Sequence, residues 1–285
     1  MQLASFSIIN MLCFSSKLKT EPVYRKDAEN LFSALCNCGE QFTLIQNTKD
    51  IWARDYMPIA TRSGRYISFR YEPSYLKGFE HLQTNYRRDV APQFNFPITY
   101  SDINLDGGNI VFSPKKSRAI ISERVFFENP GRNASDIIAE LSALLEAEIL
   151  IMPCLKPRSD MTGHADGMVR FLDECTVLCN RPASPHGFET RVKRWLKKNR
   201  LGPVDFPFFP PDSKSSLKND DAQSAEGCYI NFLQTQKAVF LPTFGIPQDA
   251  DALFAAREIF KTPVIPVSIP RIAAEGGCLN CISWN

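Results

Sequence analysis

The sequence predicts an α/β protein in which strands and helices alternate along the chain. Apolar stretches rich in β-forming residues, such as EILIMPC (148–154), alternate with stretches of helical spacing, such as SDIIAELSALLEA (135–147). Intervals of 51, 60, 65 and 50 residues separate five distinctive polar or reactive residues that end successive units: Asp55, Asp106, Asp166, Asn231 and Cys281. Such a period is typical of radial or stacked repeats, although any α/β protein can end its strands at similar intervals. The spacing alone leaves the repeat open.

Apolar, β-rich composition marks the expected strands, and recurrence of apolar residues every three to four positions marks the expected helices. The expected strands are 5–14, 41–46, 117–127, 148–154, 174–180, 227–234, 237–245, 263–269 and 276–284. The expected helices are 26–38, 135–147, which opens on a Ser or Asp cap, 190–200 and 248–260. Residues 203–225, rich in Pro, Ser and charge, interrupt this alternation and are expected to form an exposed loop.

Composition excludes several classes of partner. The 285 residues are 44% hydrophobic and carry 33 Lys and Arg against 31 Asp and Glu, without a long basic run, so neither nucleic acid nor an anionic membrane is an expected partner. No apolar stretch approaches the length of a membrane span, and the apolar start lacks the basic flank of a signal peptide. The nine scattered cysteines favour reduced thiols and a cytoplasmic location. The spacings in CNC (36–38) and CLNC (278–281) do not form the paired motif of a zinc site, so no metal is expected.

Three short motifs contain candidate acid–base residues. In IWARDYMP and NLDGGNIVF, Asp55 and Asp106 fit ordinary turns as well as functional carboxylates. In GHADGMVRF, His164 and Asp166 are two positions apart, so on a strand their side chains would face the same side. An imidazole beside a carboxylate suits proton transfer, although an isolated pair of this kind is more often structural.

The closing stretch GGCLNCISW contains a candidate nucleophile. Cys278 and Cys281 are three positions apart, so on an extended strand they would face opposite sides, and only one could enter a given pocket. A free cysteine is usually a small buried hydrophobe, so neither thiol is decisive alone. Together the motifs supply a thiol, an imidazole and carboxylates. That set suits a guanidinium, which carboxylates can hold while a thiolate attacks its central carbon.

In this order, the blocks IWARDYMP, LDGGNIV, GHADGMVRF, KAVFLPTFGIPQDADAL and GGCLNCIS resemble the agmatine deiminase family, including the bacterial Porphyromonas-type peptidyl-arginine deiminases. The resemblance implies a five-bladed, pseudo-symmetric α/β propeller (pentein-like) built from strand–helix–strand repeats. It also implies a single guanidino-modifying catalytic domain over residues 1–285 that needs no cofactor.

The same resemblance implies roles for individual residues. Cys281 matches the family nucleophile, His164 the general acid and base, and Asp55 and Asp166 the carboxylates that hold the guanidinium. The expected substrate-binding residues are Trp52, Arg54, Asp106, Gly107 and Asn231.

The reaction implied is hydrolysis of a guanidino group to a ureido product and ammonia through a covalent thiouronium intermediate. The substrate is a small guanidino compound or the arginine side chain of a peptide, and a homo-oligomer is left open. Asn280 precedes Cys281 where agmatine deiminases commonly carry His, so agmatine, free arginine and peptidyl-arginine all remain candidates. The alternatives are an amidinotransferase that uses the same intermediate and a non-catalytic guanidinium-binding propeller.

Overall fold

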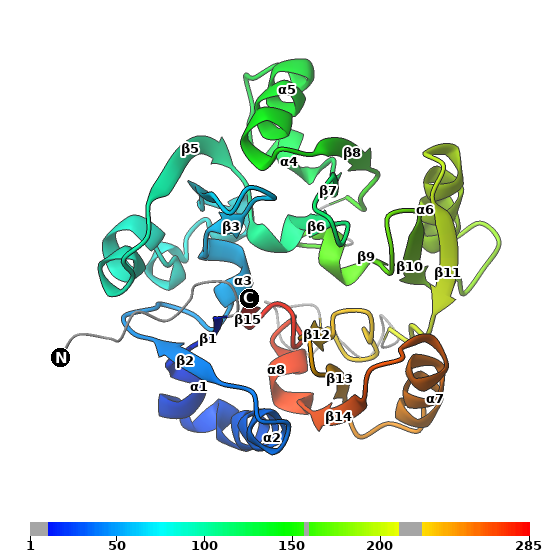
Figure 1. Ribbon diagram of the computed structural model, residues 1–285. Helices are drawn as coiled ribbons and strands as arrows, with labels where there is room; N and C mark the ends of the chain where they lie inside the picture. The colour runs from blue at the N-terminus through cyan, green and yellow to red at the C-terminus, as the bar shows by residue number, and fades with distance from the viewer. Residues whose placement is uncertain (1–10, 157–159, 211–223) are drawn as a thin grey trace.

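Five three-stranded sheets surround a common centre in the computed structural model (Figure 1). The structure describes residues 11–156, 160–210 and 224–285. The sheets, each written in its spatial order, are β15 (Ser283–Trp284), β1 (Leu12–Ser15) and β2 (Phe42–Ile45); β3 (Ile59–Ala60), β4 (Tyr66–Arg70) and β5 (Ile98–Asn104); β6 (Ile110–Phe112), β7 (Arg118–Ser122) and β8 (Glu148–Met152); β9 (Val169–Phe171), β10 (Thr176–Asn180) and β11 (Gly202–Phe206); β12 (Leu233–Gln234), β13 (Val239–Thr243) and β14 (Val264–Ser268).

Every sheet has the same pairing pattern. The short first strand pairs antiparallel with the middle strand, which pairs parallel with the third strand. A parallel pair needs a long crossover, and helices on the outside of the ring supply it in four sheets (Figure 1). The helices are α1 (Lys17–Thr20), α2 (Arg25–Asn37), α3 (Ala53–Tyr56), α4 (Arg124–Phe127), α5 (Ala134–Leu145), α6 (Phe188–Lys198), α7 (Asp249–Ile259) and α8 (Pro270–Ala274). The predicted five-bladed α/β propeller is therefore confirmed.

Burial explains why the middle strands are almost continuously apolar. β1 is buried along its whole length, and β7, β10 and β13 are buried at four of their five residues. A strand covered on both faces has no solvent side, so its sequence does not alternate. The outer helices are one-sided instead: α2 buries Ala28, Leu31, Phe32 and Leu35 at helical spacing against this core.

The two ends of the described chain close the ring. β15, near the C-terminus, pairs antiparallel with β1, so that Cys13 faces Trp284 and Phe14 faces Ser283. The indole of Trp284 donates a hydrogen bond to the backbone oxygen of Pro58 at 2.6 Å, which ties β15 to the entry of the next sheet. The segment that follows Cys281 is thus part of a sheet, and its position depends on closure of the whole ring.

The five spaced residues all lie in equivalent connections, each joining the third strand of one sheet to the first strand of the next. These connections contain, in chain order, Asp55, Asp106, Asp166, Asn231 and Cys281. Asp106 and His164 even share a backbone conformation, φ −76° and ψ 139° against φ −69° and ψ 137°, at the start of two 3-10 turns, η7 (Gly107–Asn109) and η8 (Ala165–Gly167). The repeat interpretation is confirmed.

Several element boundaries differ from the predictions. The strand expected over 117–127 ends at Ser122, because its parallel partner β8 ends opposite it at Met152, and the rest forms α4. The strand expected over 227–234 is reduced to β12, since most of that stretch forms the connection that carries Asn231. The loop expected over 203–225 begins as β11, and residues 211–223 lie outside the described part.

Two helical features and the first strand also differ. α5 begins at Ala134, after Asn133 and before the Ser135 and Asp136 expected as caps, and no side chain caps its first turn. Asp55 lies in the single helical turn α3 and not in a simple strand-end turn. β1 begins at Leu12, and the earlier part of the strand expected over 5–14 falls largely outside the described residues. No helix among the described residues is long and apolar enough to cross a membrane.

Candidate active site

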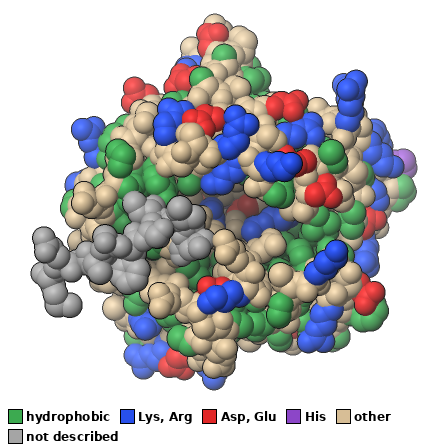
Figure 2. All heavy atoms as spheres, viewed as in Figure 1, with side chains coloured by type: hydrophobic (Ala, Val, Ile, Leu, Met, Phe, Trp, Pro, Cys, Tyr) green, Lys and Arg blue, Asp and Glu red, His purple; other side chains and the backbone are tan. Residues whose placement is uncertain are grey.

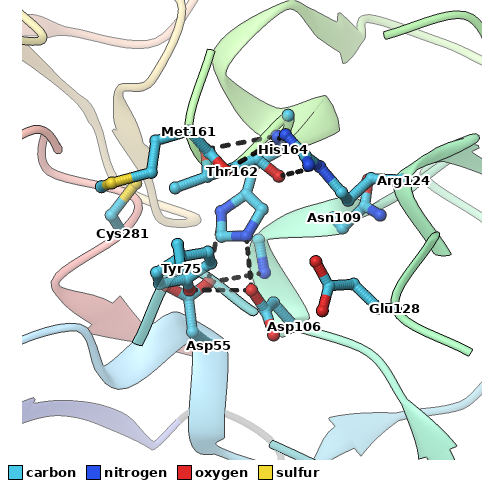
Figure 3. Close-up of polar contacts among 12 residues, drawn as sticks. Asp55, Tyr75, Asp106, Asn109, Arg124, Glu128, Met161, Thr162, His164 and Cys281 are labelled. Carbon is cyan, nitrogen blue, oxygen red and sulfur yellow. Dashed lines mark hydrogen bonds and ion pairs between the residues drawn. The ribbon is translucent and has the colours of Figure 1, made fainter. Parts of the chain in front are cut away.

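His164 lies among carboxylates that come from neighbouring repeats. Its Nε2 is 2.8 Å from Asp106 Oδ2, and its Nδ1 is 3.6 Å from Asp55 Oδ1 (Figure 3). The phenol of Tyr75 donates to the same Asp106 oxygen at 2.8 Å, and Asp55 Oδ1 accepts from the backbone N–H of Gly108 at 3.0 Å. The imidazole and both carboxylates are buried, so each contact acts with little screening by water.

The carboxylates keep this imidazole charged. Burial by itself lowers the pKa of His164, but the charge of Asp55 and the hydrogen bond and charge of Asp106 outweigh burial and raise the pKa to about 10. Burial raises the pKa of Asp55 to about 7, although the nearby imidazolium opposes that shift. The carboxylates therefore favour the imidazolium form of His164, which carries the proton that a leaving group needs.

His164 and Asp166 both face the site, but not for the reason expected from the sequence. Asp166 lies in the 3-10 turn η8, and His164 directly precedes that turn. Neither residue is on a strand, because the chain here crosses from one sheet to the next. The carboxylate of Asp166 accepts a hydrogen bond from Asn280 Nδ2 at 2.7 Å and lies 3.8 Å from the sulfur of Cys281. Its position links the imidazole side of the site to the thiol side.

Cys281 lies opposite His164 and Asp55 in the site (Figure 3). Its Sγ and its backbone N–H both lie 3.3 Å from Asn231 Oδ1. The extended strand expected here is wrong: residues 278–282 turn, with the N–H of Ile282 donating to the oxygen of Cys278. The two thiols nevertheless diverge, since Cys278 is buried with its Sγ 3.6 Å from the backbone oxygen of Ala225.

The surroundings of Cys281 favour the neutral thiol. Burial first, and then the charges of Asp166 and Asp55, raise the pKa of Cys281 well above its ordinary value. A nucleophilic thiolate in this site requires a compensating positive charge, and a bound guanidinium would supply one.

Alkylation of Cys281 by iodoacetamide should consequently be slow at neutral pH. Because the raised pKa leaves only a small thiolate fraction, the rate should keep rising about tenfold per pH unit to beyond pH 9. Peptide mapping of the alkylated chain measures each cysteine separately, with the exposed Cys36 and Cys175 as internal references. A rate for Cys281 that levels off near pH 7 would contradict the assigned environment.

Two glycines allow the connections to approach one another. A Cβ on Gly108 would lie 2.6 Å from Asp55 Oδ1 and 2.7 Å from His164 Nδ1, and one on Gly107 would lie 2.0 Å from the backbone oxygen of Arg54. All three distances are shorter than real Cβ contacts, so any larger residue must displace the carboxylate, the imidazole or the backbone. Gly107, predicted to bind substrate, therefore has a demonstrable role in packing.

Gly108→Ala should lower kcat/KM by roughly 10²-fold or more, because a displacement of about 1 Å at reacting groups has effects of this size. Gly167→Ala is a matched control, since a Cβ there meets nothing within 4 Å. Both variants are to be assayed with the same substrate after their thermal unfolding has been compared. Equal activity of the two would show that the close contact at Gly108 is unimportant.

The glycine pair that precedes Cys278 packs against an aromatic ring. A Cβ on Gly277 would lie 2.4 Å from the ring of Trp52, and Gly276 has a φ of +100°, which L side chains rarely adopt. Trp52 flanks α3 and is half-buried beside this connection. Trp52 therefore lies beside the connection that carries Cys281, and Gly277 leaves the space that the Trp52 ring needs.

Arg54 directs its guanidinium toward residues on either side of Cys281. Its backbone N–H donates to the oxygen of Cys281 at 3.0 Å, while its guanidinium donates to Asn280 O at 3.4 Å and to Asn285 Oδ1 at 2.7 Å. Arg54 therefore fixes the backbone that carries the thiol, and its charged group borders a separate pocket. Among the described residues, no group of three or more His, Cys, Asp or Glu is placed to hold a metal ion.

A match along almost the whole chain identifies the family. The model of the Porphyromonas-type peptidyl-arginine deiminase family matches residues 2–285. The chain belongs to this family. The resemblance inferred from the five sequence blocks is thereby confirmed.

Individual relatives of this deiminase family member are distant. The chain is 22% identical over 222 residues to a candidate agmatine deiminase of Lactococcus lactis subsp. lactis, covering 70% of this chain and 58% of that protein. It is 25% identical over 260 residues to a candidate agmatine deiminase of Streptomyces coelicolor, covering 82% and 75%. The chain thus spans less than two thirds of the Lactococcus protein. The solved agmatine deiminase of C. jejuni has the same fold, with a TM-score of 0.73 at 15% identity over 97% of this chain and 92% of that one.

Sequence reasoning missed three residues that organise the site of this family member. Tyr75 completes the contacts of Asp106, and its turn is held by Glu128, which accepts from the backbone and hydroxyl of Ser74 at 2.8 and 2.6 Å. Arg124 donates to the backbone oxygens of residues 160–162 and so fixes the loop that precedes His164 (Figure 3). None of the three stands in a motif or at a regular spacing, so only the structure reveals them.

Proposed function

We propose that this protein is a single-domain deiminase that hydrolyses a guanidino group to a ureido product and ammonia through a covalent bond to Cys281. The carrying observation is the convergence on one site of the half-buried thiol of Cys281 with a buried imidazolium and three buried carboxylates, from four connections. This set can bind a planar cation, attack its carbon and transfer protons without another group. Membership of the family supports the same activity.

In the proposed mechanism, Asp55 and Asp166 pair with the guanidinium. The positive charge of the substrate offsets the carboxylates that raise the pKa of Cys281, so the thiol releases its proton to solvent when the substrate binds. The thiolate adds to the central carbon, and the imidazolium of His164 gives its proton to the departing ammonia. A thiouronium remains on the sulfur.

The second half of the reaction reverses the role of the imidazole. His164, now neutral, accepts a proton from a water molecule as that water attacks the thiouronium carbon. The carbon–sulfur bond then breaks and the hydroxyl proton of the adduct passes to solvent, which releases the neutral ureido product and regenerates the thiolate. Asp106 and Tyr75 hold the imidazole in place through both steps. Asn231 aligns Cys281 through its backbone and sulfur contacts.

The nine cysteines are all free thiols, which supports the proposal of a cytoplasmic enzyme. The substrate class is a guanidino compound, with agmatine, free arginine and peptidyl-arginine as candidates. The agmatine deiminase names of the relatives favour a small amine-bearing guanidine.

The decisive experiment offers purified protein agmatine, free arginine and an arginine-containing peptide in parallel, and measures ammonia and ureido product. Turnover of one of them, absent in Cys281→Ser, is the expected result. Product that forms only when an amine acceptor is added would indicate an amidinotransferase. No turnover of any of the three, with or without an acceptor, would favour a guanidinium-binding protein.

A further inference from the structure

A second pocket opens on the central axis at the end opposite the thiol. It has a volume of about 190 Å³. Its wall includes Ala60, Phe112 and Asn285, each of which lies at or directly after the end of the first strand of a sheet. These strands follow Asp55, Asp106 and Cys281 in the chain and run away from the active site. A hollow with Lys and Arg side chains in its wall is visible at the middle of this face, where Figure 1 marks the C-terminus (Figure 2).

Three cations line this pocket: Arg54, Lys116 and Arg170. They come from three different repeats, so the fold brings them together. Among the described residues, none of the three forms an ion pair with a carboxylate within 4.0 Å. Asp166 also borders the pocket, so the side chains of its wall carry three positive charges and one negative charge.

The hydrogen bonds of these cations go to neutral acceptors. Arg54 donates to Asn280 O and Asn285 Oδ1, Arg170 donates to Asn280 Oδ1 at 2.9 Å, and Lys116 Nζ donates to the backbone oxygen of Ala60 at 2.6 Å. Within the described chain, these bonds engage only part of the donors that each cation has.

The cations also act unfavourably on one another. Burial, followed by the charge of Arg54, lowers the pKa of Lys116 and lowers the pKa of Arg170 to about 10. Grouping like charges in a half-buried pocket is unfavourable unless an opposite charge joins them. An anion in the pocket would remove this repulsion and accept the remaining N–H donors.

We propose that the pocket lined by Arg54, Lys116 and Arg170 binds a small oxyanion, such as inorganic phosphate or a carboxylate. Forked guanidinium donors match the oxygen spacing of both groups, and Lys116 adds a point charge from the opposite wall. The pocket shares Asp166 with the proposed active site, but its three cations take no part in the proposed reaction and would be present whether or not the chain is a deiminase. Asn280 connects the two, since its amide accepts from Arg170 and donates to Asp166.

The test of this proposal is calorimetric titration of the purified protein at constant ionic strength, with sodium phosphate and, separately, with sodium acetate. One anion per chain should bind to the wild-type protein, and phosphate should raise the thermal unfolding temperature. Lys116→Gln should weaken binding by roughly tenfold or more, the loss expected for one charge-assisted hydrogen bond. The anion that binds with the higher affinity identifies the oxyanion class.

Lys115→Gln is the matched control, because it removes the same charge at the neighbouring, exposed position that does not line the pocket. It should bind the anion as the wild-type chain does, and Lys116→Arg should restore most of the affinity lost in Lys116→Gln. Absence of binding of both anions to the wild-type chain, or equal binding by the Lys115→Gln and Lys116→Gln variants, would overturn the proposal. Because the readout is binding, the result is independent of whether any guanidino substrate is turned over.

Discussion

Cys281→Ser should lower kcat/KM by about 10³-fold or more, since a serine hydroxyl at this position is a far weaker nucleophile and a covalent step is lost. The fold should survive, because Ser preserves the size of the side chain and the contact to Asn231 Oδ1. The measurement is steady-state release of ammonia with whichever guanidino compound the wild-type protein turns over, combined with thermal unfolding of both proteins.

Cys278→Ser is the control for this substitution. Cys278 is completely buried, and among the described residues its sulfur has the backbone oxygen of Ala225 as its hydrogen-bond partner, so the change should affect stability more than turnover. The opposite pattern, with Cys281→Ser active and Cys278→Ser inactive but folded, would assign the nucleophile to Cys278.

Asp166→Asn should lower kcat/KM by roughly 10²- to 10³-fold. The substitution removes one charged partner of a buried cation, and the loss of such a partner typically costs about 3–5 kcal/mol. The same change should accelerate alkylation of Cys281 in the absence of substrate, because the charge of Asp166 is one of the causes that raise the pKa of this thiol. Turnover and alkylation should therefore move in opposite directions.

The opposed readouts separate a loss of charge from a loss of structure. A misfolded variant would lose turnover and expose together the seven thiols that are buried or half-buried in the fold. Asp166→Asn should change only the reactivity of Cys281 and of the neighbouring Cys228 and Cys278, since, besides burial, the charge of Asp166 raises the pKa of these three thiols. Asp102→Asn, at an exposed position of β5, controls for the removal of a carboxylate elsewhere and should match the wild-type protein in both assays. An Asp166→Asn variant with normal turnover would refute the proposed pairing with the guanidinium.

The sequence was most informative where local patterns and burial coincide. The amphipathic stretch over 26–38 became α2, and the apolar run in 174–180 became the buried strand β10, because each pattern already contains the face that packs. It was least informative at the connections. There the chain from Gly277 to Ile282 turns in response to Trp52, Asn231 and ring closure, none of which is local.

The candidate residues could be chosen from the sequence, whereas their arrangement in the site could be seen only in the tertiary structure. Spacing and motif chemistry made Cys281, His164 and the aspartates candidates, and the resemblance to the family implied the role of each. Only the tertiary structure decided that Asp106 holds the imidazole directly, that Tyr75 supports Asp106, and that Arg54 extends toward the opposite pocket. The physical reason is the propeller itself: each repeat fixes its own strands and helix, but hydrogen bonds and pKa shifts in the site form between repeats, and these require all five sheets to close around the axis.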